Sequence, residues 1–74
     1  MNEQITPEEI QKHWLAAMDS VNFINELNAG QHDERMTAEE KADALSRNKD
    51  HLKIMLAKDF WTNQDLTPLR NAAQ

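Results

Sequence analysis

Cysteine is absent from this 74-residue chain, which also has a single glycine, two prolines and no tyrosine. Without cysteine, neither a disulfide framework nor a thiolate metal site can stabilise the fold. A β-sandwich or β-barrel needs many turns, which so few glycines and prolines do not favour. No apolar run approaches the ~20 residues that span a bilayer. The segment Met1–Thr6 also lacks the basic and apolar regions of a secretion signal. We therefore expect an all-α, cytoplasmic protein without contact to a membrane.

Chain length and net charge narrow the possible domain organisation and binding partners further. A chain of this length forms one domain, residues 1–74, and buries only about 60% of the surface that its unfolded form exposes, so self-association is expected. The net charge is −5, of which residues 1–30 contribute −4, residues 31–58 zero and residues 59–74 −1. Because no basic stripe is present, direct binding to nucleic acid or to an acidic membrane surface is not expected.

Two clear helix starts and a weaker third are visible in the sequence. The runs Thr6-Pro7-Glu8-Glu9 and Thr37-Ala38-Glu39-Glu40 each place a capping hydroxyl three residues before a glutamate, and Thr67-Pro68 repeats the start without an acid. Gly30 can end the first helix. We predict a helix over 7–28, a loop over 29–37, a second helix from Ala38 to Lys58 or Phe60 (38–60), and a C-terminal cap segment, 62–74, with a short helical turn.

Apolar residues recur at helical spacing in both long segments, which predicts an antiparallel hairpin. The first helix carries one main stripe: Ile10, Trp14, Ala17, Met18, Val21 and Ile24. The second carries another: Ala38, Ala42, Leu45, Leu52, Met55, Leu56 and Phe60. Residues whose numbers add up to about 66 should then face each other, which puts Trp14 in the core opposite Leu52, with His51 close by. Leu66, Leu69 and Ala72 could fold back over the open end of the hairpin.

A second, smaller apolar group lies opposite the main stripe of the first helix and contains Ala16, Phe23 and Leu27. It needs a further neighbour, which is either a symmetry mate or the C-terminal segment. We predict a homodimer that closes into a helical bundle. The candidate interface residues are Phe23, Leu27, Ile54, which stands alone on the far side of its helix, and Trp61, which is adjacent to Phe60 and cannot point inward together with it. The alternative for Trp61 is a cap on the domain's own end.

The histidines are interpreted as structural. His13 lies four residues after Glu9 on one helix flank, but this pair lacks a third ligand. His32-Asp33-Glu34 is interpreted as a solvated loop, with adventitious metal capture as the alternative. His51 is expected at the seam between the helices. The Glu-x-x-His pattern of di-iron bundles does not occur. We therefore predict no metal site and no cofactor.

The sequence shows no catalytic motif, and two asparagines are candidates for setting the helix register. Ser20 and Ser46 do not sit on a glycine turn, and one glycine excludes a phosphate-binding loop, so we predict that the protein is not an enzyme. Asn25 and Asn48 lie at the edges of the apolar stripes. Two interpretations are open. A buried asparagine would penalise a helix register that leaves its amide unpaired, or both side chains contact water.

The stretch from Arg47 to Thr62 (RNKDHLKIMLAKDFWT), continuing through Asp65-Leu66-Thr67-Pro68, resembles the C-terminal part of short uncharacterised open reading frames of tailed, notably marine, phages. The resemblance implies a phage source, a role in the host-cell cytoplasm and a host or phage protein as partner. The predicted function is a small acidic helical protein-interaction module that is homo-oligomeric. The alternative is an acidic nucleic-acid mimic or inhibitor that blocks a host DNA-binding protein.

Overall fold

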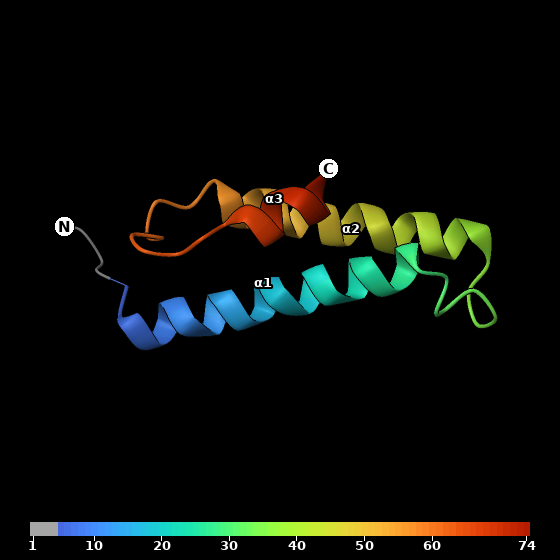
Figure 1. Cartoon of the computed structure of the whole chain (residues 1–74), viewed down its shortest axis with the longest axis horizontal. Helices are drawn as coiled ribbons and strands as arrows, with labels where there is room; N and C mark the ends of the chain where they lie inside the picture. The colour runs from blue at the N-terminus through green and yellow to red at the C-terminus, as the bar shows by residue number, and fades with distance from the viewer. Residues whose placement is uncertain (1–4) are drawn as a thin grey trace.

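The computed structural model describes residues 5–74, which form three helices and no strand (Figure 1): α1 (Pro7–Asn28), α2 (Ala38–Leu56) and α3 (Thr67–Ala73). The all-α prediction is confirmed, and α1 and α2 begin at the predicted residues. The first four residues of the segment Met1–Thr6, interpreted as lacking a targeting signal, lie outside the described residues.

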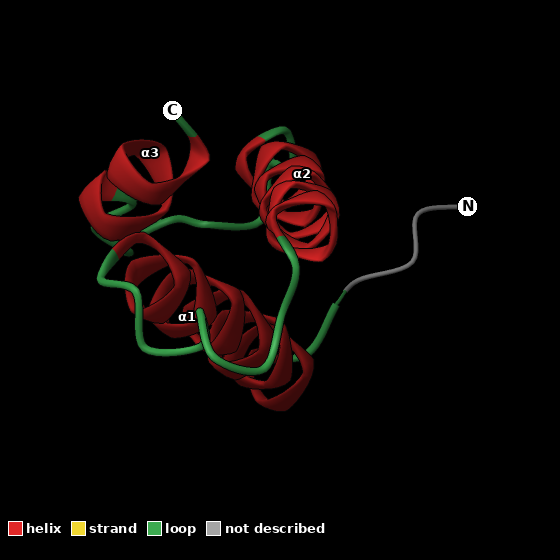
Figure 2. Ribbon diagram, turned by 90° about the vertical axis from the view of Figure 1, so that its right-hand side faces the viewer, coloured by secondary structure: helices red, strands yellow, loops and turns green. Residues whose placement is uncertain are grey.

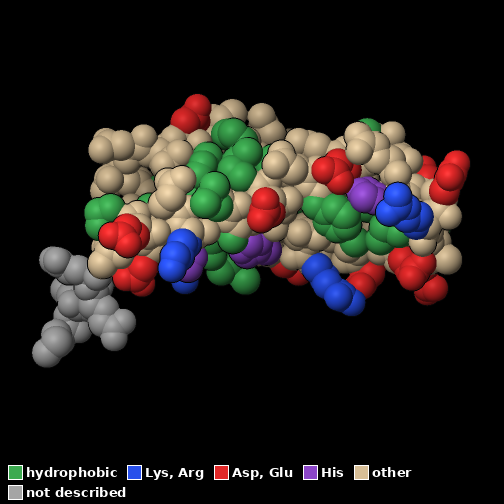
Figure 3. All heavy atoms as spheres, turned by 90° about the horizontal axis from the view of Figure 1, so that it is seen from below, with side chains coloured by type: hydrophobic (Ala, Val, Ile, Leu, Met, Phe, Trp, Pro, Cys, Tyr) green, Lys and Arg blue, Asp and Glu red, His purple; other side chains and the backbone are tan. Residues whose placement is uncertain are grey.

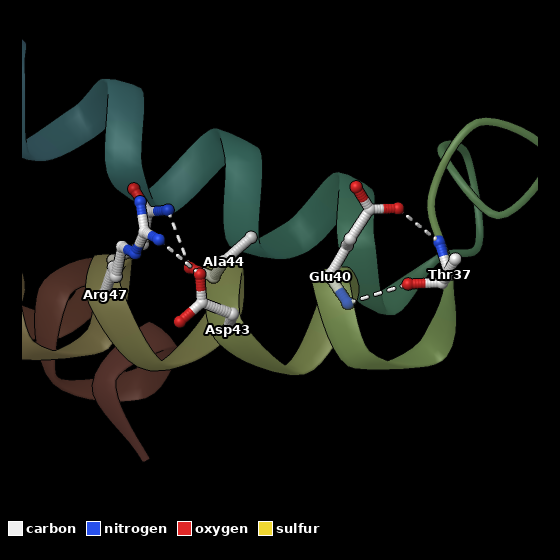
Figure 4. Close-up of polar contacts among 6 residues, drawn as sticks. Thr37, Glu40, Asp43, Ala44 and Arg47 are labelled. Atoms are coloured by element: carbon white, nitrogen blue, oxygen red, sulfur yellow. Dashed lines mark hydrogen bonds and ion pairs between the residues drawn. The ribbon is translucent and has the colours of Figure 1, made fainter.

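Both long helices begin with a complete capping box. In α2, the Glu40 N–H donates to the Thr37 hydroxyl at 3.1 Å, and the Glu40 carboxylate accepts from the Thr37 N–H at 2.8 Å (Figure 4). Thr6 and Glu9 make the same pair of bonds at the start of α1. Each box satisfies two N–H groups that have no partner within the helix, which fixes where the helix starts.

The turn after α1 depends on Gly30. Its φ of +80° is a left-handed conformation that other residues adopt only at a cost, and its N–H donates to the Leu27 carbonyl. A Cβ at this position would also stand 3.1 Å from the Asp33 carboxylate. The sequence signal for the end of α1 is therefore a backbone requirement of the structure.

The register of the hairpin differs from the predicted one. Ser20 and His51 are hydrogen-bonded across the two helices, and their numbers add up to 71 rather than to about 66. α2 is thus displaced along α1 by about five residues, or about 7.5 Å at 1.5 Å per residue. Figure 1 shows the result, because α2 extends past one end of α1 and α1 extends past the other end of α2. His51 accordingly faces Ser20, and the predicted position opposite Trp14 is wrong.

Two further differences from the sequence prediction lie at the two ends of α2. The start of α2 projects beyond α1, so Ala38 and Ala42 of the predicted apolar stripe are exposed. At the other end, α2 stops at Leu56, before the predicted Lys58 or Phe60, and the first turns of α1 extend past it (Figure 1). The chain that follows turns back over the exposed start of α1.

α3 occupies the third corner of a triangle with α1 and α2 (Figure 2). Leu69 is fully buried there, and Ala72 and Ala73 are buried beside it. Together with Ala17, Val21, Ile24, Leu52 and Met55 they form the hydrophobic core. The C-terminal segment folds back as predicted, but α3 packs along one side of the hairpin instead of over its open end, so the chain itself closes that side (Figure 2).

The start of α3 corrects the interpretation of Thr67 as a helix cap. Thr67 is the first residue of the helix, and its N–H and hydroxyl donate to the Asp65 carboxylate at 3.0 and 2.7 Å. These two bonds, hydroxyl first, lower the pKa of Asp65 below its ordinary value of 3.8, and the charge of Arg70 adds to the effect. The acid that holds this helix start comes before the threonine rather than after it.

The molecule is elongated, with extents of 47, 22 and 20 Å. Within residues 5–74, no helix combines the length and the apolar character needed to cross a membrane.

Candidate interaction face

The α1–α2 pair has two sides, and α3 covers one of them. The half-buried hydrophobic residues that pack against the core from α1 and α2 are Trp14, Met18, Leu45 and Leu56. On a helical wheel they lie on one flank of each helix. The opposite flank carries Ala16, Ser20 and Phe23 on α1 and Arg47, His51 and Ile54 on α2, each at spacings of four and three residues. We call these six residues the open face.

The hydrogen bond between Ser20 and His51 joins the two halves of the open face. Ser20 Oγ lies 2.8 Å from His51 Nδ1, and Ser20 is only 7% exposed. An unpaired hydroxyl at this position would carry a desolvation cost, so the pair favours the register in which both groups meet. The predicted structural role of His51 at the helix seam is confirmed. Within the described residues, no buried side-chain nitrogen or oxygen lacks a hydrogen-bond partner.

Asn48 does not set the register. Its amide donates to the carbonyl of Ala44, one turn back in the same helix, at 2.8 Å, and Asn25 is exposed. The register role that sequence reasoning considered for these amides belongs to Ser20 and His51. A signal for it was present, since Ser20 interrupts the apolar run of the first helix between Ala17 and Val21.

Two large hydrophobic side chains stand out into solvent, Ile54 at 56% exposure and Leu15 at 55%. Ile54 belongs to the open face, and the exposed Ala16 lies close to the same height on α1. Leu15 points about 100° further round α1, away from both neighbouring helices. The two side chains are therefore equally exposed but lie on different surfaces.

The predicted interface residues Phe23 and Leu27 differ in exposure. Phe23 is half-buried and meets the ring of His32 edge-on, with 5.2 Å between the ring centroids. His32 Nε2 in turn lies 2.9 Å from the Glu26 carboxylate. Leu27 is fully buried, so its place among the interface residues is wrong: it has no surface to offer a partner. The loop histidine thus packs on α1 instead of standing in solvent.

Trp61 is engaged by its own chain. Its indole N–H donates to the Met55 carbonyl at 2.7 Å, and its ring lies edge-on to Trp14 at 5.9 Å. Phe60 stacks on His13 at 5.4 Å between centroids. These aromatic side chains cover the part of α1 that extends past α2. Trp61 is half-buried in this cover, as the cap on the domain's own end requires, and Trp14 is half-buried as well.

Charged groups around the open face are mixed in sign. Arg47 is paired with Asp43 on the same helix (Figure 4), and both side chains are largely exposed. Lys41 bonds to Asp33 of the loop at 3.0 Å. Seen from the α1 side, acidic and basic side chains are interspersed around patches of hydrophobic ones (Figure 3). Across residues 5–74, His, Asp and Glu side chains nowhere form a group of three that could hold a metal ion.

Comparisons with known proteins return no relative. No family model matches the chain, and neither a curated protein nor a solved structure is similar to it. The open face is therefore interpreted from its own residues.

Proposed function

We propose that the protein is a small helical interaction module that binds through the open face, and that a second copy of the chain is a partner for this face. The observation that carries the proposal is Ile54, which stands 56% exposed beside the small, exposed Ala16 on the side that α3 leaves uncovered. The phage resemblance fits a module of this kind that acts on a host or phage protein in the host cytoplasm.

The energetics of association support this use of the face. Burying a large aliphatic side chain contributes about 1.5–3 kcal/mol. In a two-fold dimer each contact occurs twice, so one modest patch gains twice the free energy. The predicted dimer thus keeps Phe23 and Ile54 as interface residues, while Leu27 and Trp61 act within the chain.

The distribution of acids favours this function over nucleic-acid mimicry. Mimicry of a phosphate backbone needs a dense array of carboxylates. On the α1 side of the molecule the acidic side chains lie in small groups among hydrophobic and basic ones, not in one continuous array (Figure 3). On α2, the acidic Asp43 is already paired with Arg47.

The test compares Ile54→Glu with Leu15→Glu by analytical ultracentrifugation. We expect the native chain to sediment at about twice its 8.6 kDa at the upper end of the micromolar concentration range. Ile54→Glu is expected to give a folded monomer because two carboxylates would be buried in the interface. Leu15→Glu removes an equally exposed hydrophobic side chain from another surface and is expected to leave the dimer intact.

Two results would contradict the proposal. A native chain that sediments as a folded monomer throughout the micromolar range removes the second copy as a partner. A dimer that Leu15→Glu dissociates and Ile54→Glu leaves intact places the interface on the outer side of α1 instead of the open face.

A further inference from the structure

We propose that, in this dimer, α1 of each copy lies antiparallel against α2 of the other, about a two-fold axis parallel to the helices. Ile54 of each copy then packs against Ala16 of the partner subunit. This arrangement rests on the proposed function, since it requires that a second copy binds the open face.

The positions of the residues along the helix axes determine which side chains meet across the two-fold axis. The bond between Ser20 and His51 sets residues whose numbers add up to 71 at one height, so Ile54 stands level with position 17, next to Ala16. A two-fold axis parallel to the helices exchanges α1 and α2 but preserves height. It therefore brings the protruding Ile54 of one copy over the methyl side chain of Ala16 of the partner subunit, as a knob over a hole.

A two-fold axis perpendicular to the helices is the competing arrangement. It places α1 on α1 and α2 on α2, so Ile54 lies opposite α2 of the partner subunit and, where the axis crosses at its height, opposite the other Ile54. Ile54 then never faces Ala16, and the open-face residues of α2 offer no small side chain opposite the protruding one. Side-chain shape thus favours the parallel axis.

Charge favours the same arrangement. α1 carries Glu8, Glu9, Asp19 and Glu26 against Lys12, a balance of −3, whereas α2 carries four acids and four bases. The perpendicular axis sets two helices of charge −3 against each other, and the parallel axis sets each of them against a neutral helix.

The area of the open face determines how tightly the two copies are expected to bind. α1 and α2 lie side by side only over positions 15–28 of α1, a length of about 21 Å. With a width of about 20 Å, the open face offers roughly 400 Å² per partner, about half of the 800 Å² that specific interfaces bury on average, so a weak dimer is expected. Dissociation of the dimer in the micromolar range is the consequence.

Introduced cysteines test the arrangement, because the native chain has none. Ala16→Cys and Ile54→Cys are made in two chains that differ in mass through a terminal tag, and the chains are mixed under mild oxidation. A disulfide needs Cβ atoms about 3.5–4.5 Å apart, so it forms efficiently only between residues in direct contact. Both positions are exposed in the single chain, so neither substitution is expected to prevent folding.

We expect the mixed disulfide between the two variants to exceed, several-fold, the disulfide that either variant forms with itself. Leu15→Cys is the matched control: it is adjacent to Ala16 and as exposed as Ile54, and it should form only the background level with Ile54→Cys. Dominant Ala16–Ala16 or Ile54–Ile54 disulfides in a chain that sediments as a dimer overturn this arrangement and leave the proposed function standing. A native chain that sediments as a monomer removes the second copy as a partner and, with it, this arrangement.

Discussion

Replacing Leu69 with alanine tests whether the short C-terminal helix closes the fold. α3 has only seven residues, too few for a helix that is stable by itself in water. Leu69 is its largest fully buried side chain, and it packs in the core with residues of α1 and α2. The substitution therefore removes the main contact that attaches α3 to the hairpin.

The expected cost is about 2–5 kcal/mol, the range for a fully buried leucine that leaves a cavity. A domain of this size has a total stability of roughly 4–11 kcal/mol, so the loss is a large part of the whole. Urea denaturation followed by circular dichroism measures it. With an m value of about 1 kcal/mol per molar, the midpoint should fall by roughly 2 M or more.

The measurement is made in the Ile54→Glu background, so that dimer formation does not contribute to the apparent stability. Leu15→Ala is the control, since it shortens an exposed leucine on a helix and should change the stability by no more than about 0.5 kcal/mol. A loss below about 1 kcal/mol for Leu69→Ala would mean that α3 is not part of the cooperative core.

Three further substitutions test local features. Gly30→Ala should cost about 1–2 kcal/mol, because alanine disfavours the φ of +80°, and should lower the thermal midpoint by several degrees. Thr37→Ala should cost about 1 kcal/mol in urea denaturation by removing the hydroxyl of the α2 capping box. The lowered pKa of Asp65 means that its carboxylate stabilises the fold above pH 3.8 and loses this effect as the pH falls further. Asp65→Asn should therefore be less stable than the native chain at pH 7, and the difference should shrink in acid; an equal difference at both pH values would refute this.

The helix starts and the fold class could be predicted because their causes are local. A capping box lies within four residues, and the threonine–glutamate pairs at Thr6 and Thr37 form in the structure as they read in the sequence. The end of α1 was predictable for the same reason, since Gly30 supplies the left-handed residue that a helix end needs.

The helix register could not be read from the apolar pattern alone. Sliding α2 by about five residues moves it by more than one turn, and much of the apolar stripe still finds apolar neighbours after such a shift. The hydrogen bond of Ser20 to His51 distinguishes the registers, but one hydroxyl within a stripe does not identify its partner. The burial of Leu27 and the shorter α2 follow from long-range packing, which no local pattern records.

The candidate face was partly predictable. Ile54 could be named from the sequence, because it is the one apolar residue on the far side of its helix, and it is exposed in the structure. Trp61 could not be assigned, because the choice between a partner and the domain's own end depends on how far α1 extends past α2. The displaced register decides it, and the indole bonds to the Met55 carbonyl instead.

The two sides of the hairpin are stabilised by different means, which has a consequence for the proposed dimer. The sequence predicts that either the C-terminal segment or a second copy covers the apolar surface left by the hairpin. α3 covers one side with Leu69, Ala72 and Ala73, and the Ser20–His51 bond closes the seam on the other side without covering it. Folding and association should therefore respond to separate changes: Leu69→Ala lowers the stability of a single chain, and Ile54→Glu lowers association at nearly constant stability. If Ile54→Glu instead unfolded the chain, the open face would be part of the core, and a monomer could not present it to a partner.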